Sequence, residues 1–262
     1  MNDSDDNLLY IWNPSTESER RLSYPWLSYT QFSFGYDTST ETYKAVSFGV
    51  NYKQGDFKSK VKVFSFGRQD SWRKIQPFPV IPIYKFNGVH LNGIINWLAL
   101  RDYSNSGYFS LDHSFITHED YVIISLDLST DTYTQLLLPQ GFDKAKHYKP
   151  IELVVLRESL CFCHDFEKTH LMIWQMKDFG VQESWIQLFK INYNKFFPSF
   201  KLDLLPLYLS DNGDTLLLAN SQEDKWTVVY NCAGDRAVRI GRSKGMMWSE
   251  AQYYVESLVQ PY

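Results

Sequence analysis

Val122-Ile-Ile-Ser-Leu-Asp127 is a short apolar segment, followed by a polar turn and by a second segment that ends at Leu136. The same arrangement occurs five times in the 262 residues. Its second segments end at Leu22, Ile75, Leu136, Leu188 and Ile240, so that successive ends are 53, 61, 52 and 52 positions apart. This spacing is too regular for unrelated loops and indicates an internal repeat of about 52 residues.

A second kind of hairpin lies between these segments. Gly88-Val-His-Leu-Asn-Gly-Ile-Ile-Asn-Trp-Leu98 contains the dipeptide Asn92-Gly93, and a later segment contains Asn212-Gly213. Asn-Gly dipeptides supply the positive φ angles that tight hairpin turns require. Each repeat therefore holds two hairpins, or four short strands, which is typical of a β-propeller blade.

We predict an all-β, β-propeller-like fold of about five four-stranded blades, of which the first is incomplete. Complete blades are expected at residues 31–75, 88–136, 151–188 and 204–240. Only eight residues precede Leu9, and they are too few and too polar to supply the inner hairpin of the first blade. Gln252-Tyr-Tyr-Val-Glu-Ser-Leu-Val259 has apolar residues at strand spacing and could supply one strand there, joining the two ends of the chain. An unpaired sheet edge in that blade would lower stability.

The composition supports a folded core and argues against several classes of partner. Hydrophobic residues make up 44% and aromatic residues 17% of the chain, which excludes disorder through low hydropathy. We expect residues 1–8 to be a disordered acidic start and residues 9–262 to be a single domain. The net charge of -4 does not favour binding to nucleic acid or to an anionic membrane. The sequence shows neither a signal peptide nor an apolar run long enough to span a membrane, so we expect a cytoplasmic or nuclear location, or both.

Few residues suggest catalytic chemistry. Nucleophile motifs and phosphate-binding loops are absent from the sequence, so we expect no enzymatic activity, no cofactor and no metal. Cys161-Phe-Cys163-His164 is the most metal-like cluster, but on a strand the two thiols share one face and the imidazole takes the other. The cysteines are expected to be reduced, buried thiols. His113 and His118, with acidic neighbours, could build a proton-transfer or metal site, or belong to a polar loop.

Aromatic residues in two long connections are the candidates for contact with a partner protein. Loops longer than about 12 residues in a compact domain are often functional, and exposed aromatic side chains are frequent hot spots of protein interfaces. The alternative for both loops is local packing of the rings beneath the loop. The candidates are Tyr103, Tyr108, Phe109 and Phe115 in residues 101–120, and Tyr193, Phe196, Phe197 and Phe200 in residues 192–201.

Several segments, taken in order, resemble the F-box-associated domain of plant F-box proteins, a type often labelled F-box/kelch-repeat. Each segment is weak by itself, but their order and spacing are specific and cover about residues 9–259. They include Leu9-Tyr-Ile-Trp-Asn-Pro-Ser-Thr16, Phe34-Gly-Tyr-Asp37, Ser71-Trp-Arg-Lys-Ile75, Ile173-Trp-Gln-Met-Lys-Asp-Phe-Gly-Val-Gln-Glu-Ser-Trp185 and Tyr254-Val-Glu-Ser-Leu-Val259. The Gly-Gly pair of true kelch repeats does not occur, so the kelch label describes architecture at most.

The resemblance implies a protein-interaction module similar to the substrate-recognition part of an SCF-type ubiquitin ligase subunit, with no catalytic residue of its own. Its partner would be a target protein for ubiquitination, and a Skp-type adaptor only if an F-box lies upstream, since this sequence contains no F-box. We expect either a fragment of a longer F-box protein or a stand-alone target-binding domain. Two alternatives stay open: an enzyme or carbohydrate-binding propeller with a central pocket, and a truncated paralogue without function.

Overall fold

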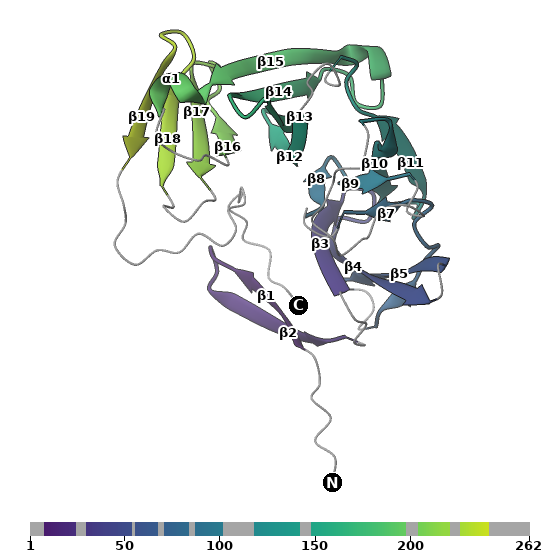
Figure 1. Cartoon of the computed structure of the whole chain (residues 1–262). Coiled ribbons are helices and arrows are strands. Elements are labelled where there is room, and N and C mark those ends of the chain that lie inside the picture. Colours follow the sequence, from purple (N-terminus) through teal and green to yellow (C-terminus); the bar gives the residue numbers. More distant parts are fainter. Residues whose placement is uncertain are drawn as a thin grey trace. The chain divides into compact units, whose positions relative to one another are not determined.

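The computed structural model describes residues 8–24, 30–53, 56–67, 71–83, 87–101, 118–141, 148–197, 204–220 and 226–240. The described elements are nearly all β-strands, joined by a few short helical turns. They fall into two compact units, one with the strands up to Leu100 and one with those from Tyr148 onward, while the two strands within residues 121–137 are divided between them. Figure 1 gives the labels of the elements. Among the residues described, no helix has the length and apolar character that crossing a membrane requires.

The first unit begins with a two-stranded hairpin and a four-stranded antiparallel sheet. The hairpin pairs β1 (Leu8–Asn13) with β2 (Ser18–Ser23). The sheet consists, in spatial order, of β3 (Thr30–Asp37), β4 (Thr42–Lys53), β5 (Asp56–Ser65) and β6 (Arg73–Lys74). Leu9 and Leu22 of the hairpin pack against Phe64 and Phe66, which gives this part of the unit its core.

A third sheet has the order β11-β10-β9-β7, and β8 also pairs with β9. Its strands are β7 (Ile81–Pro82), β8 (Val89–Leu91), β9 (Ile94–Leu100), β10 (Tyr121–Asp127) and β11 (Tyr133–Leu137), with the short helix η1 (His118–Asp120) before β10. Asn92 and Gly93 have φ angles of 48° and 79° in the two-residue turn between β8 and β9. The Asn-Gly prediction is therefore confirmed at this turn.

Trp97 of β9 fills the core between the β3–β6 sheet and the third sheet. Its side chain is fully buried, and its ring meets Phe48 and Phe78 edge to face, at centroid distances of 6.0 and 5.2 Å. The indole N–H donates to the hydroxyl of Ser33 at 2.9 Å. One side chain thus joins β3, β4 and β9 through both apolar and polar contacts.

The second unit contains two four-stranded antiparallel sheets whose strands follow one another in sequence. The first sheet consists of β12 (Tyr148–Leu156), β13 (Ser159–Phe166), β14 (His170–Met176) and β15 (Trp185–Asn192), with the short helix η3 (Gln182–Ser184) before β15. The second consists of β16 (Leu204–Leu209), β17 (Thr215–Asn220), β18 (Thr227–Asn231) and β19 (Arg236–Ile240). The helix α1 (Tyr193–Phe196) connects them. A core that includes Leu171, Ile173, Leu218 and Trp226 lies between the sheets.

The strand order confirms the predicted repeat and the all-β, propeller-like fold. Each of the four predicted four-stranded segments is one sheet of the structure, and β7 is added to the second of them. In the described part of the chain β1 and β2 form a hairpin without further strands, as the prediction of an incomplete first blade requires. β1 begins at Leu8, one residue before the predicted boundary. The predicted closing strand at 252–259 and residues 1–7 lie outside the described residues.

One turn differs from its prediction. In the Asn212-Gly213 dipeptide only Gly213 has a positive φ, of 76°, and the connection between β16 and β17 extends over residues 210–214. The side-chain oxygen of Asn212 accepts a hydrogen bond from the amide of Asp214 at 3.1 Å. This bond stabilises a loop that is longer than a two-residue turn, so Asn212 does not have to adopt a positive φ.

Candidate partner-binding surface

The structure places three of the eight aromatic residues that were predicted to contact a partner. Tyr193 and Phe196 lie in α1, and Phe197 follows directly. Tyr193 is 6% exposed, and its hydroxyl donates to Asp165 at 2.6 Å. The ring of Phe197 meets Trp226 edge to face at 4.9 Å. These rings pack against the core of the second unit, which is the alternative that the sequence left open, and their contact with a partner stays a prediction.

The remaining five candidates lie outside the described residues. Residues 102–117 and 198–203 are not described, and they contain Tyr103, Tyr108, Phe109, Phe115 and Phe200. Of the predicted proton-transfer or metal site, only η1 at residues 118–120 is placed. Partner contact by these five residues and chemistry at His113 and His118 therefore stay predictions.

The segment Cys161-Phe-Cys163-His164 lies in β13 and belongs to the core. Both thiols are fully buried in the cluster between the two sheets, while His164 stacks on Phe162 at 5.6 Å. The predicted split of thiols and imidazole between the two faces of the strand is confirmed. Burial raises the pKa of Cys161 to about 12, so this thiol stays protonated. In the described part of the chain, no group of three or more His, Cys, Asp or Glu side chains is placed to hold a metal ion.

The other sulfur and imidazole contacts are also structural. The cysteines are free thiols, as predicted, but Cys232 is only half-buried. The Nε2 atom of His164 accepts a hydrogen bond from the indole N–H of Trp174 at 3.1 Å. His164 is therefore held in the neutral form as an acceptor, which suits a packed core better than proton transfer.

Acid is expected to destabilise the second unit through His164. Burial lowers the pKa of His164 to about 4, although the contact with the Asp165 carbonyl acts in the opposite direction. Because an unfolded histidine binds a proton near pH 6.5, the unfolded chain takes up a proton that the native chain excludes. Stability therefore falls as the pH falls from about 6.5 to about 4, by about 3 kcal/mol in total. Urea unfolding at pH 7, 5.5 and 4 measures this change, and His164→Gln should flatten the profile. If the stability of His164→Gln falls as steeply between pH 6.5 and pH 4 as that of the wild-type chain, other groups cause the loss.

An exposed apolar surface lies where the connection from β14 to β15 meets the end of β11. Phe179 and Val181 in this connection are 40% and 46% exposed, and Leu137 of β11 is 46% exposed. The indole N–H of Trp185 donates to the carbonyl of Leu137 at 3.1 Å, which brings β11 to the base of the connection. We call residues 177–184 the Phe179 loop.

Hydrogen bonds within the Phe179 loop, and one to Leu138 outside it, stabilise its conformation. Gly180 has a φ of 85°, which lets the chain reverse between the two exposed apolar residues. The Ser184 hydroxyl accepts from the amide of Asp178 at 3.1 Å and lies 2.7 Å from the carbonyl of Val181, to which it donates. The side chain of Gln182 donates to the carbonyl of Leu138 at 2.8 Å. A loop ordered in this way loses little conformational entropy when it binds a partner.

The predicted partner-binding residues do not include this surface, although the sequence contains a signal for it. Phe179 and Val181 flank Gly180 within an otherwise polar turn. The same segment contributes to the family resemblance, but the long connections drew attention because of their length. A short loop that exposes apolar side chains is recognised only when its burial is known.

A family model described as "F-box associated beta propeller domain" matches residues 1–261. The chain belongs to this family. The F-box/kelch-repeat protein At3g23880 of Arabidopsis thaliana is 27% identical over 266 residues, covering 98% of this chain and 65% of the relative. F-box protein CPR1 of the same plant is 23% identical over 245 residues, covering 83% of this chain and 56% of the relative. The F-box associated domain described here thus spans less than two thirds of the length of either relative.

Among solved structures, the F-box associated domain matches a puromycin-hydrolysing peptidase of Mycobacterium tuberculosis with a TM-score of 0.46. The identity is 11%, and the match covers 93% of this chain and 38% of the peptidase. A likeness of this degree carries no argument about function.

Proposed function

We propose that this F-box associated domain binds a target protein so that an SCF-type ubiquitin ligase can ubiquitinate it. The observation that carries the proposal is the family match over residues 1–261. The relatives named as F-box proteins support it. In this proposal binding is the whole activity of the domain, and it performs no catalytic step.

The partners follow from this role. The target is a protein rather than nucleic acid or membrane, in keeping with the net charge of -4. A Skp-type adaptor joins the assembly through an F-box, and the related F-box proteins are longer than this chain, which covers 65% and 56% of them. The proposed location is the cytoplasm, the nucleus or both.

Turnover of captured proteins tests this function. The tagged chain is expressed in plant cells with and without an F-box segment fused before residue 1, and proteins that co-purify with both forms are identified by quantitative mass spectrometry. We expect at least one of them to be degraded faster in the presence of the F-box fusion and to be stabilised by a proteasome inhibitor. If every co-purifying protein has the same half-life with both forms, the proposal is wrong.

Replacing Phe179 and Val181 together by serine is expected to weaken capture of the target without unfolding the chain. Both side chains are exposed, so the free energy of unfolding should change by no more than about 0.5 kcal/mol. Loss of an interface hot spot worth about 2 kcal/mol would lower affinity about 30-fold. Co-purification of the identified target, measured against the wild-type chain, provides the readout.

Val238→Ser with Ile240→Ser is a matched control, because it removes two apolar side chains of β19 that are at least as exposed as Phe179 and Val181. Equal capture by the Phe179 loop variant and by the wild-type chain would exclude this loop from the target surface and would leave the proposed function intact.

A further inference from the structure

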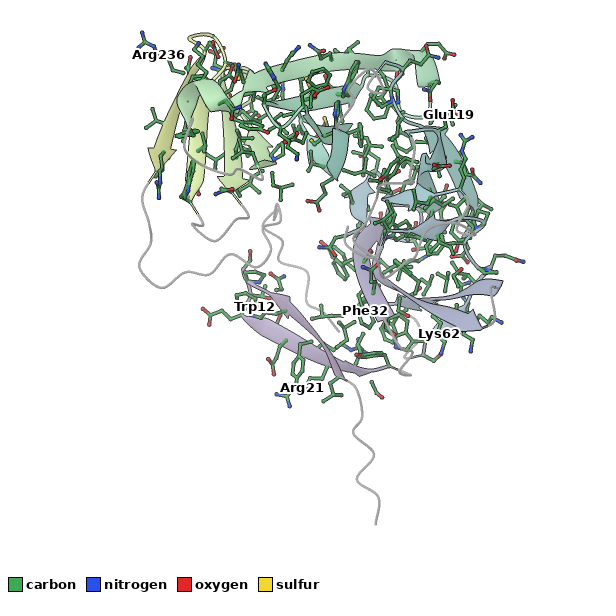
Figure 2. All side chains as sticks on the ribbon, viewed as in Figure 1. Trp12, Arg21, Phe32, Lys62, Glu119 and Arg236 are labelled. Atoms are coloured by element: carbon green, nitrogen blue, oxygen red, sulfur yellow. The ribbon has the colours of Figure 1, made fainter. Side chains whose placement is uncertain are left out.

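Three lysines lie on one face of the β3–β6 sheet. Lys60 and Lys62 are two residues apart in β5 and therefore point to the same side. Lys62 stands directly opposite Lys74 of β6 in the antiparallel register. Lys60 and Lys74 are exposed, and Lys62 is half-buried. We call these three residues the lysine row; Figure 2 labels Lys62 on this sheet.

The lysine row has no acidic partner among the described residues. None of its three ammonium groups forms an ion pair or a hydrogen bond with a described side chain or carbonyl. By contrast, Arg73 beside it pairs with Asp131 at 2.6 Å. Like charges opposite each other on neighbouring strands destabilise a sheet. None of the described residues offsets this repulsion, and an anionic partner would remove it.

Half-buried aromatic side chains lie beside the lysine row. Ser47 of β4 is opposite Lys62, and Phe32 of β3 is opposite Ser47. Phe32 and Lys62 therefore point to the same face of the sheet, on strands that are separated by β4. The ring of Phe32 lies 6.2 Å from that of Trp72, which is two residues before Lys74. Phe32 also meets Tyr24 edge to face at 4.8 Å, and the indole N–H of Trp72 donates to the carbonyl of Ser23 at 3.1 Å. These rings therefore pack against the end of the first hairpin, and the three ammonium groups are what the row offers to a partner.

We propose that the lysine row binds an extended acidic segment of the target protein, with carboxylates at alternate positions. In an extended chain, side chains at i and i+2 are about 6.8 Å apart on one face, which matches the spacing of Lys60 and Lys62. Lys74 adds a second cation at the level of Lys62. This inference rests on the proposed function, because the target supplies the segment.

The size of the lysine row favours a short peptide segment over other polyanions. Proteins that bind duplex nucleic acid commonly neutralise about 6–10 phosphates, and recognition of anionic lipid surfaces commonly uses clusters of about 4–8 basic residues. The row has three cations in a chain of net charge -4. Two or three carboxylates of one extended segment match it in number and in spacing.

Binding of synthetic peptides tests the geometry. Fluorescence anisotropy with the full chain compares two labelled 12-residue peptides of identical composition, each with five Glu, six Ser and one Phe. In one peptide the glutamates occupy every second position, and in the other they occupy positions 1, 2, 5, 6 and 9, so that no two of them are two residues apart. We expect the alternating peptide to bind at least about threefold more tightly, with an affinity that falls as salt rises. Equal binding of the two peptides would contradict the proposed alternation.

Charge reversal locates the site. Lys60→Glu with Lys74→Glu and the control pair Lys168→Glu with Lys190→Glu each replace two exposed lysines, so both lower the net charge equally. We expect the first pair to weaken binding of the alternating peptide at least about tenfold, and the control pair to change it less than about twofold. Thermal unfolding of both variants shows that the chain is folded. An equal loss in both variants would mean that the peptide responds to net charge alone, and the proposal would fail.

Two further measurements separate this inference from the proposed function and from other anions. If the Lys60→Glu/Lys74→Glu chain still accelerates target turnover as the F-box fusion, the lysine row is not the docking site and the proposed function stands. If no protein is turned over by the wild-type fusion but the alternating peptide binds through the row, the row is an acidic-segment site and the proposed function is wrong. Tighter binding to phosphatidylserine vesicles or to a 20-base-pair duplex than to the peptide would overturn the peptide assignment.

Discussion

Lys44→Ala is expected to lower the free energy of unfolding by about 3–5 kcal/mol. The ammonium group of Lys44 lies 2.8 Å from a carboxylate oxygen of Asp37, and both side chains are almost completely buried. The same ammonium donates to the carbonyl of Leu128, which follows β10 in the turn that leads to β11. The substitution leaves a buried carboxylate without its cation and a buried carbonyl without its donor. Urea unfolding followed by tryptophan fluorescence measures the loss.

Lys60→Ala is the matched control, because Lys60 is an exposed lysine in the adjacent strand of the same sheet. It should change stability by no more than about 0.5 kcal/mol. The double variant Asp37→Asn/Lys44→Met should lose less than the sum of its two single variants, because neither partner is then left charged in the core. If Lys44→Ala lowers the free energy of unfolding by less than about 1 kcal/mol, the ion pair of Lys44 with Asp37 contributes no more than an exposed surface ion pair.

The pH dependence of the Lys44 variant gives a second readout of the same pair. Burial alone would raise the pKa of Asp37, but the hydrogen bonds from Lys44, Thr40 and Ser39 outweigh it and hold the pKa below its usual range. The native chain therefore keeps this carboxylate ionised where the unfolded chain takes up a proton. That stability is present above about pH 3.9 and is lost as the pH falls further. The decline below pH 4 should shrink in Lys44→Ala, whereas the decline between pH 6.5 and 4 due to His164 should persist.

Trp97→Ala is also expected to cost about 3–5 kcal/mol, because it empties a fully buried site between two sheets. The variant loses the ring contacts with Phe48 and Phe78 and leaves the hydroxyl of Ser33 without the indole donor. Trp97→Phe keeps most of the ring and should cost less, since the hydrogen bond contributes only about 1 kcal/mol. Urea unfolding measures both variants.

Trp12→Ala is the control for this prediction, because Trp12 is 62% exposed on β1 and its loss should change stability by about 0.5 kcal/mol or less. Gly88→Ala tests the same site by adding a methyl group to it instead of removing the ring. A methyl group at Gly88 would lie 2.3 Å from the indole nitrogen of Trp97 and 2.5 Å from the Ser33 hydroxyl. It should therefore destabilise the chain by about 1–3 kcal/mol through overpacking. Equal stabilities of Trp97→Ala and Trp12→Ala would contradict the central role of Trp97.

The repeat of four-stranded sheets was predictable because its information is local. Within each sheet, strands pair with their neighbours in sequence, except that β7 pairs with β9, so apolar runs such as Val122–Asp127 and turns such as Asn92-Gly93 carry the pattern by themselves. The predicted segments correspond to sheets for the same reason. The turn at Asn212-Gly213 departed from its prediction because a side-chain bond from Asn212 replaced the expected backbone conformation.

The candidate surfaces were less predictable, since composition and loop length do not report burial. Tyr193 and Phe197 were candidates because they lie in a long connection, yet their rings join the core. Phe179 and Val181 lie in a short connection and are exposed. The alternation of Lys60 and Lys62 is visible in the sequence, but their relation to Lys74 depends on strand register.

By itself, the sequence determined the all-β repeat and the sheet boundaries, because hydrophobic alternation and turn residues act over a few positions. Tertiary structure alone decided which distant groups meet: Lys44 with the Leu128 carbonyl, 84 residues away, and Trp97 with Ser33, 64 residues away. Contacts between sheets depend on packing of whole faces, and no local pattern records which side chains will be opposite each other. The buried network and the uncompensated lysine row therefore became visible only once the strands had their partners and their register.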